Sequence, residues 1–390
     1  MTKENGKPQI RFAKFKDTWK QRKLLSCIQS ITDFRGRTPK KLGMDWSESG
    51  YLALSALNVK DGYIDFSQDV HYGNQELYDK WMSGKELHRG QVLFTTEAPM
   101  GNVAQVPDNK GYILSQRTIA FDVEEEILSE NFLATLLRTP NVFNDLTALS
   151  SGGTAKGVSQ KSLSGLDVVI PKNIDEQNKL TDYFINLDNL ITLHQRKYDK
   201  LAKVKKSMLE KMFPKNGTNV PEIRFKGFTD AWEQRKLGEL VDVCSGRDYK
   251  HLSEGTIPVY GTGGYMLSVN DALSYDRDAI GIGRKGTIDR PYILKAPFWT
   301  VDTLFYAVPR EKVDLNFAFD IFQNIDWKRK DESTGVPSLS KTAINDIDVL
   351  APKHGEQQTI GQFFAAIDHL ITLHQRKFFI YKSDTNLHFN

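Results

Sequence analysis

The feature that most constrains the fold of this chain is an internal repeat at the two ends of each half. The segment at residues 8–12 recurs at 221–225 with one substitution, Gln9 against Glu222, and both copies are followed by a tryptophan and by Gln-Arg-Lys-Leu. The octet Leu-Ile-Thr-Leu-His-Gln-Arg-Lys closes both halves, at 190–197 and 370–377. Because sequence repeats mark structural units built more than once, we expect one scaffold with two different middles. A duplication whose middles have merely drifted is the alternative.

Composition sets limits on the classes of protein that this chain can belong to. It has 390 residues, with 52 basic against 49 acidic and a formal net charge of +3, so any surface for nucleic acid must be local. The two cysteines, Cys27 and Cys244, form no Cys-x-x-Cys pair, and neither a zinc site nor a disulfide framework is expected. Residues 1–20 are polar and no stretch is suited to span a membrane, which favours a soluble cytoplasmic protein without membrane contact.

We call the repeated segments that begin the two halves the heads and the repeated segments that close them the tails. The tails predict two long helices. Apolar residues that step by three and four form a seam along residues 175–213, interrupted only by His194 and Lys205, and the seam recurs along 355–390. We expect the two helices to pack as an antiparallel coiled coil that fixes the spacing of the halves. The sequences diverge after Lys377, which favours a shortened second helix. The seam residues are Leu180, Phe184, Leu187, Ile191, His194, Tyr198 and Leu201, then Ile360, Phe364, Ile367, Ile371 and His374.

The middles carry short apolar runs separated by glycine, proline and asparagine, which is typical of short strands with a few helices. The predicted fold class is therefore α+β, with two mixed α/β domains, two long helices and an internal pseudo-two-fold repeat. The predicted boundaries are 1–174 and 214–354 for the two domains with their repeated heads, and 175–213 and 355–390 for the helices.

Three loops in the middles, 32–38, 245–250 and 282–287, combine glycine with basic, hydroxyl and aromatic residues. Such loops can approach a duplex closely, and arginine can bond both acceptors of a guanine edge. Each loop alone could be an ordinary surface turn, but the duplication favours a DNA-binding role for all three. Segments 150–154 and 333–338 are interpreted as structural turns. The candidate DNA-binding residues are Arg35, Arg37, Thr38, Arg247, Tyr249, Lys250, Arg284, Lys285 and Thr287.

The sequence matches some motifs of enzymes in part, but it lacks the features that those motifs need to function. Residues 281–286 match Gly-x-Gly-x-x-Gly, yet Pro291 follows where a dinucleotide site needs a helix. No phosphate-binding Gly-x-x-x-x-Gly-Lys loop is present, and Asp289-Arg290-Pro291-Tyr292 lacks the first proline of the adenine methyltransferase signature. We therefore predict no catalytic residues, no metal and no cofactor on this chain.

The repeated heads with Trp19 and Trp232, the Glu-Gln tails and the unlike middles resemble the specificity subunit of type I restriction-modification systems. The resemblance implies two target-recognition domains that each read half of a split site in double-stranded DNA. It also implies helices that hold modification subunits, two in number, which methylate adenine with S-adenosylmethionine. Restriction subunits that use ATP and Mg²⁺ would complete the complex.

Two other classes of function stand beside this one. A duplicated protein-interaction scaffold without DNA specificity would use the same repeat, whereas a self-contained nuclease or methyltransferase is disfavoured by the missing motifs. Salt dependence separates a DNA reader from a scaffold, because phosphate contacts release counterions and weaken steeply with added salt.

Overall fold

The computed structural model describes Pro8 and residues 11–150, 157–215 and 217–389, with side chains described as far as Ser383. Gln9 and Ile10 of the first repeated head, and residues 151–154 of the first interpreted turn, lie outside the described residues. The chain forms two compact units. Unit 1 comprises Met1–Thr192 and Phe378–Asn390, and unit 2 comprises Leu193–Lys377.

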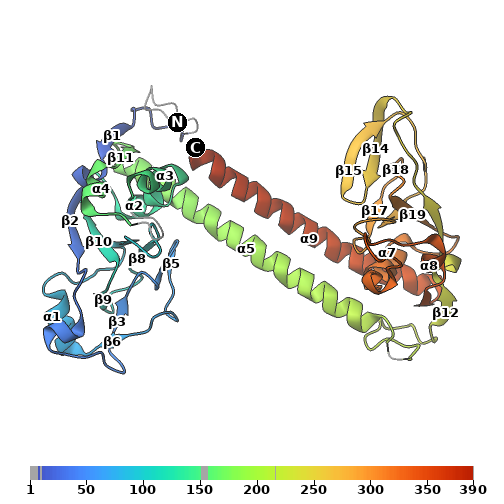
Figure 1. Ribbon diagram of the computed structural model, residues 1–390, viewed down its shortest axis with the longest axis horizontal. Coiled ribbons are helices and arrows are strands. Elements are labelled where there is room, and N and C mark those ends of the chain that lie inside the picture. Colours follow the sequence, from blue (N-terminus) through green and yellow to red (C-terminus); the bar gives the residue numbers. More distant parts are fainter. Residues whose placement is uncertain (1–7, 9–10, 151–156, 216, 390) are drawn as a thin grey trace. The chain divides into compact units, whose positions relative to one another are not determined.

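Unit 1 is built around an antiparallel four-stranded sheet of order β2-β10-β7-β8, accompanied by a three-stranded sheet β6-β3-β9 and the two-stranded ribbons β1-β11 and β4-β5 (Figure 1). The strands are β1 (Lys20–Lys23), β2 (Ile28–Asp33), β3 (Tyr51–Leu54), β4 (Val59–Lys60), β5 (Tyr63–Ile64), β6 (Tyr72–Gly73), β7 (Val92–Thr95), β8 (Val103–Gln105), β9 (Tyr112–Leu114), β10 (Thr118–Val123) and β11 (Asp167–Ile170). The shorter helices are α1 (Gln75–Met82), α2 (Glu130–Leu137), α3 (Pro140–Leu149) and α4 (Gln160–Gly165).

The central strands β7 and β10 of the four-stranded sheet in unit 1 are covered on both faces, which explains why they are mostly apolar. Val92 and Phe94 of β7 pack into the core that contains α2, whereas Leu93 between them packs into the core that contains α1. Alternate residues of a strand point to opposite faces, and β7 is buried throughout its length. The side chains of Ser129 and Asn74 cap the first turns of α2 and α1, so both covering helices begin at a residue suited to that role.

Unit 2 repeats this plan. Its four-stranded sheet has the order β13-β19-β16-β17, with a three-stranded sheet β15-β14-β18 and a ribbon β12-β20. The strands are β12 (Glu233–Lys236), β13 (Val241–Ser245), β14 (Glu254–Gly261), β15 (Gly264–Val269), β16 (Ala279–Gly283), β17 (Tyr292–Leu294), β18 (Trp299–Thr300), β19 (Leu304–Pro309) and β20 (Asp348–Ala351). The shorter helices are α6 (Leu237–Leu240), α7 (Leu315–Asn324) and α8 (Lys341–Asn345). The predicted α+β class with an internal repeat is confirmed.

Two long helices, α5 (Ile174–Met212) and α9 (His354–Phe389), each contribute to both units. Within unit 2 they run antiparallel, because Nδ1 of His194 lies 2.8 Å from Nδ1 of His374 while Lys205, further along α5, bonds Asp368, which is earlier in α9. Burial lowers the pKa of both histidines, so one neutral imidazole can donate to the other. The twelve seam residues predicted from the sequence are all buried or half-buried.

The divergent sequence after Lys377 does not end the second helix. Helix α9 continues to Phe389 and has 36 residues, against 39 in α5. The second helix is thus three residues shorter than α5, but it is not cut short at Lys377. Phe379 and Ile380 in this part are more than half exposed, so the altered segment remains helical but presents apolar side chains to solvent.

The repeated heads and tails meet in each unit through one buried carboxylate. In unit 1, Arg11 donates two hydrogen bonds to Glu176, at 2.6 and 2.7 Å, and the indole N–H of Trp19 donates a third. In unit 2, Arg224 and Trp232 bond Glu356 in the same way. The glutamines that follow, Gln177 and Gln357, donate to the carbonyl oxygens of Pro171 and Pro352. The Glu-Gln pair therefore fastens each head and its ribbon to a long helix.

A buried polar cluster joins α7 to the helix pair inside unit 2. The ammonium group of Lys205 donates to Asp368, at 2.5 and 2.6 Å, and to Gln323, at 2.7 Å. Asp320 lies close by and is 1% exposed, and its Oδ2 has no hydrogen-bond partner among the described residues. Burial raises the pKa of Asp320 well above its ordinary value, since the attraction of Lys205 only partly offsets the desolvation.

This raised pKa predicts a pH dependence. The unfolded chain releases the Asp320 proton near pH 4, whereas the folded chain retains it, so stability is lost as pH rises from about 4 through the folded pKa. Replacing Asp320→Asn should therefore stabilise the protein at pH 8, because the neutral amide removes the cost of burying a carboxylate, and the gain should shrink towards pH 4. Urea titrations at both pH values measure this, with Asp326→Asn as an exposed control. A gain independent of pH would contradict it.

Candidate nucleic-acid interface

The predicted loop 32–38 follows strand β2 in unit 1. The guanidinium of Arg37 donates to the carbonyl oxygen of Trp81 and lies 4.2 Å from the ring centroid of Phe34. Arg35 is exposed and pairs with Asp33 at 2.6 Å, and Thr38 caps the short 3-10 helix Pro39–Leu42. Arg35 is thus available at the surface, whereas Arg37 and Thr38 also hold the loop in place.

Loop 32–38 borders a small cavity of about 240 Å³. It is lined by Arg37, Thr38 and Lys40, and also by Ser115 and Gln116 from the turn between β9 and β10. The cavity therefore places the predicted loop beside a second segment that sequence reasoning did not single out. The other residues that line the cavity are Pro39, Asp45, Trp46 and Trp81.

In unit 2 the structure brings the predicted loops 245–250 and 282–287 together around the segment 300–303. The amide of Arg247 donates to the carbonyl oxygen of Thr300, and the amide of Arg284 donates to that of Thr303, each at 2.8 Å. The guanidinium of Arg284 also donates to the carbonyl of Asp302. Two arginines that lie far apart in the sequence thus share one edge of the unit, and both side chains are exposed.

The glycines of these two loops have a steric role. A Cβ on Gly246 would lie 1.9 Å from the carbonyl oxygen of Val301, and a Cβ on Gly283 would lie 1.9 Å from that of Thr287. Only glycine permits such approaches. Lys250 and Lys285 are exposed, whereas Tyr249 packs against the core of the three-stranded sheet and Thr287 is half-buried. The structure therefore offers Arg247, Lys250, Arg284 and Lys285 as the more accessible candidates.

The first two predicted loops occupy the same position in their units. Asp33 at the end of β2 pairs with Ile119 of β10, and Ser245 at the end of β13 pairs with Phe305 of β19. Both loops therefore leave the first strand of a four-stranded sheet at the same register. The third loop, 282–287, follows β16, whose counterpart in unit 1 is β7. Sequence reasoning missed the loop after β7, because it has neither an arginine nor the glycine pattern of 282–287.

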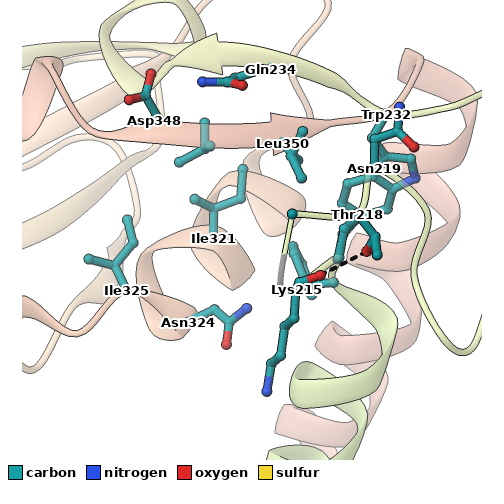
Figure 2. Close-up of a pocket in the computed structure, with 14 residues that line it drawn as sticks. Lys215, Thr218, Asn219, Trp232, Gln234, Ile321, Asn324, Ile325, Asp348 and Leu350 are labelled. Carbon is teal, nitrogen blue, oxygen red and sulfur yellow. Dashed lines mark hydrogen bonds between the residues drawn. The ribbon is translucent and has the colours of Figure 1, made fainter.

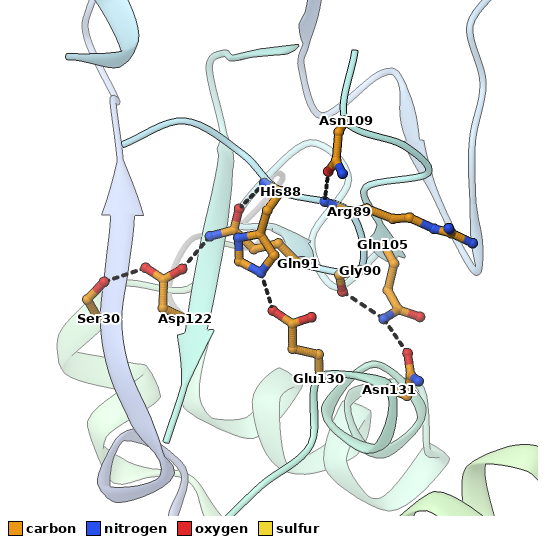
Figure 3. Close-up of polar contacts among 10 residues, drawn as sticks. All are labelled: Ser30, His88, Arg89, Gly90, Gln91, Gln105, Asn109, Asp122, Glu130 and Asn131. Carbon is orange, nitrogen blue, oxygen red and sulfur yellow. Dashed lines mark hydrogen bonds and ion pairs between the residues drawn. The ribbon is translucent and has the colours of Figure 1, made fainter. Parts of the chain in front are cut away.

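The opposite end of the sheet in unit 1 is closed by polar contacts (Figure 3). His88 Nε2 lies 2.6 Å from Glu130 Oε1 at the start of α2, and Gln105 donates to Asn131 at 2.8 Å. Asp122 accepts from Ser30 and Gln91. These side chains bond one another, so this end is held together internally.

A larger cavity of about 670 Å³ lies in unit 2, away from the predicted loops (Figure 2). It is lined by the segment after α5, the ribbon β12-β20 and α7, with Trp232 and Asn219 on one side and Ile321 on another. Asp348 on its wall is already paired with Lys236 at 2.8 Å. Its lining provides no cluster of arginines or lysines suited to a phosphate backbone.

The described part of the chain contains no group of three or more His, Cys, Asp or Glu side chains that could hold a metal ion. Within the same residues, no helix combines the length and apolar character needed to cross a membrane.

The two mixed domains and the two long helices define the class by architecture: a duplicated two-domain protein in which each domain is joined to the same pair of helices. Residues 16–203 and 229–378 match the type I restriction modification DNA specificity domain. The chain belongs to that family and is, like its members, a specificity component that is not itself catalytic.

Individual relatives support this assignment. The chain is 22% identical to the type I restriction enzyme MjaVIII specificity subunit of Methanocaldococcus jannaschii, over 90% of this chain and 88% of that protein. Its fold is similar to that of the type I restriction-modification system S subunit from M. genitalium, with a TM-score of 0.67, 15% identity, and coverage of 98% of this chain and 97% of the other.

Proposed function

We propose that each unit reads one half of a split target in double-stranded DNA, with recognition domains at 1–174 and 214–354. The observation that carries this proposal is the shared edge: in both units a loop leaves the first sheet strand at the same register and presents exposed basic side chains. Arginine at such an edge can bond guanine, and lysine can neutralise phosphates. Because the net charge is only +3, these local charges have to supply the attraction.

The helices at 175–213 and 355–390 would hold two modification subunits. The octet repeated at 190–197 and 370–377 is identical at exposed as well as seam positions, and Leu193 and Leu373 are 44% and 36% exposed. Packing alone does not require identical solvent-facing residues, whereas recognition of two copies of one partner does. In this proposal the partners supply the chemistry: adenine methylation with S-adenosylmethionine, and cleavage by restriction subunits with ATP and Mg²⁺.

Replacing Arg247→Ala or Arg284→Ala should alter only the half-site read by the second domain. Loss of a base contact costs about 1–3 kcal/mol, so the methylated motif should become degenerate at one position while the first half-site stays unchanged. Motif mapping after co-expression with modification subunits measures this.

Arg277→Ala is the matched control for both variants. Arg277 is an exposed arginine just before β16, whereas Arg284 follows the other end of that strand. If Arg247→Ala and Arg284→Ala leave the motif as unchanged as the control does, the assignment of these two loops is wrong.

The scaffold alternative makes a different prediction about binding. DNA binding by the assembled complex should weaken steeply between 50 and 200 mM salt, roughly 10³-fold or more if six or more phosphates are contacted. A protein-interaction scaffold has no counterions to release and would show no such slope with DNA.

A further inference from the structure

The loop after β7 in unit 1 corresponds residue by residue to the basic loop after β16 in unit 2. Thr95 pairs with Thr118 in one sheet, and Gly283 pairs with Leu304 in the other. One residue later, the amide of Thr96 donates to the carbonyl of Arg117, and the amide of Arg284 donates to that of Thr303, both at 2.8 Å. Thr96 therefore corresponds to Arg284, and Arg117 corresponds to Thr303.

A third segment completes this equivalence. The carbonyl of Thr96 accepts from the amide of Val158, and that of Arg284 accepts from the amide of Leu339, both at 2.9 Å. Isolated bridges join Glu97 to Gly157 and Lys285 to Ser338. Each unit therefore has the same arrangement of three segments, which we call the ledge. It consists of the segments at Thr96, Arg117 and Val158 in unit 1, and at Arg284, Thr303 and Leu339 in unit 2.

The arginine of this ledge comes from a different segment in each unit. In unit 2 it is Arg284, on the loop after the strand. In unit 1 the equivalent Thr96 is buried, and the exposed arginine is Arg117, on the turn that enters β10. The Nε of Arg117 lies 3.2 Å from Oε1 of Glu97, and both side chains are about half exposed. A guanidinium is thus present at the ledge of each unit.

The backbone of the ledge in unit 1 is held in an unusual conformation. Arg117 has φ of 62° and Ala98 has φ of 48°, in the left-handed region that L-residues rarely adopt. The carbonyl of Arg117 accepts from both the amide and the hydroxyl of Thr96, which fixes this conformation. Non-glycine residues held in this region cluster at functional sites.

We infer that Arg117 contacts a guanine of the first half-site, and that Glu97 is a positioning residue for it; this inference rests on the proposed function. Among the described residues, Arg117 has Glu97 as its side-chain partner, through Nε. The two terminal nitrogens of the guanidinium then form the edge of a planar fork, and this edge can donate one hydrogen bond each to O6 and N7 of guanine. The recognised base pair is therefore G·C.

The test maps the methylated motif of the full complex, with modification subunits, for four variants of this chain. Arg117→Ala removes the fork, and Arg117→Lys keeps the charge but not the two-bond geometry. Glu97→Gln keeps an acceptor for Nε. Arg89→Ala is the matched control, because Arg89 is an exposed arginine beyond the opposite end of β7 (Figure 3).

We expect both Arg117 variants to lose about ten-fold or more of the discrimination at one G·C position of the first half-site. The second half-site should be unchanged, and Glu97→Gln and Arg89→Ala should keep the whole motif. An unaltered first half-site in both Arg117 variants, or uniform loss of methylation with the motif intact, overturns the inference. Failure of the proposed function itself is distinguishable, because the unsubstituted chain would then direct no split motif at all.

Discussion

Replacing Glu356→Ala should destabilise unit 2 by about 3–5 kcal/mol, the usual cost of removing one partner from a buried ion pair. The carboxylate is 3% exposed and accepts two hydrogen bonds from Arg224, whose side chain is 12% exposed, and one from the buried Trp232. Truncation would leave a guanidinium and an indole N–H without their shared acceptor. Urea titration followed by hydrogen exchange of unit 2 amides measures the loss.

A matched control for this substitution is available in the same unit. Glu233 also pairs with an arginine, Arg235, at 2.8 Å, but both side chains are about half exposed or more. Exposed pairs contribute about 0–1 kcal/mol, so Glu233→Ala should have little effect. If Glu356→Ala lowered the free energy of unfolding no more than Glu233→Ala does, the Glu-Gln pair would not be what holds the repeated head against the long helix.

The substitution Phe213→Ala should also destabilise unit 2, by about 3–5 kcal/mol, as expected for a buried phenylalanine. Phe213 follows the last residue of α5 and is 6% exposed. Its ring stacks on Phe317 at 5.7 Å and meets Trp232 edge-on at 5.6 Å. It thus joins the end of the long helix to the core that supports the second recognition domain.

Calorimetry of the full chain would measure this loss, with Tyr265→Ala as an aromatic control at a position 64% exposed. The control should change the unfolding transition little. A similar small change for Phe213→Ala would contradict the role assigned to it.

The repeat and the helical seam could be predicted from sequence because they are local patterns. Identical octets and apolar residues at spacings of three and four need no knowledge of tertiary contacts. The partner of Lys205 could not be found this way. Lys205 breaks the seam, and only the folded unit shows that Asp368 and Gln323 receive its charge. The same holds for the shared acceptor of Arg224 and Trp232.

The candidate interface was only partly predictable. Loops 32–38 and 245–250 attracted attention through glycine and arginine, and the structure shows that they leave equivalent strands. Arg117 gave no such signal, because its equivalence to the basic loop of unit 2 depends on strand register and on backbone bonds between distant segments. The base contacts themselves stay a prediction in both units.

The most direct test of the central claim is genome-wide mapping of adenine methylation by single-molecule sequencing, with and without this chain, in cells that express a cognate modification subunit. Recognition through two domains predicts a motif of two specific halves with a fixed gap, present only when the chain is expressed. A stable complex that adds no methylation, or methylation that does not depend on this chain, would contradict the assignment of sequence recognition to it.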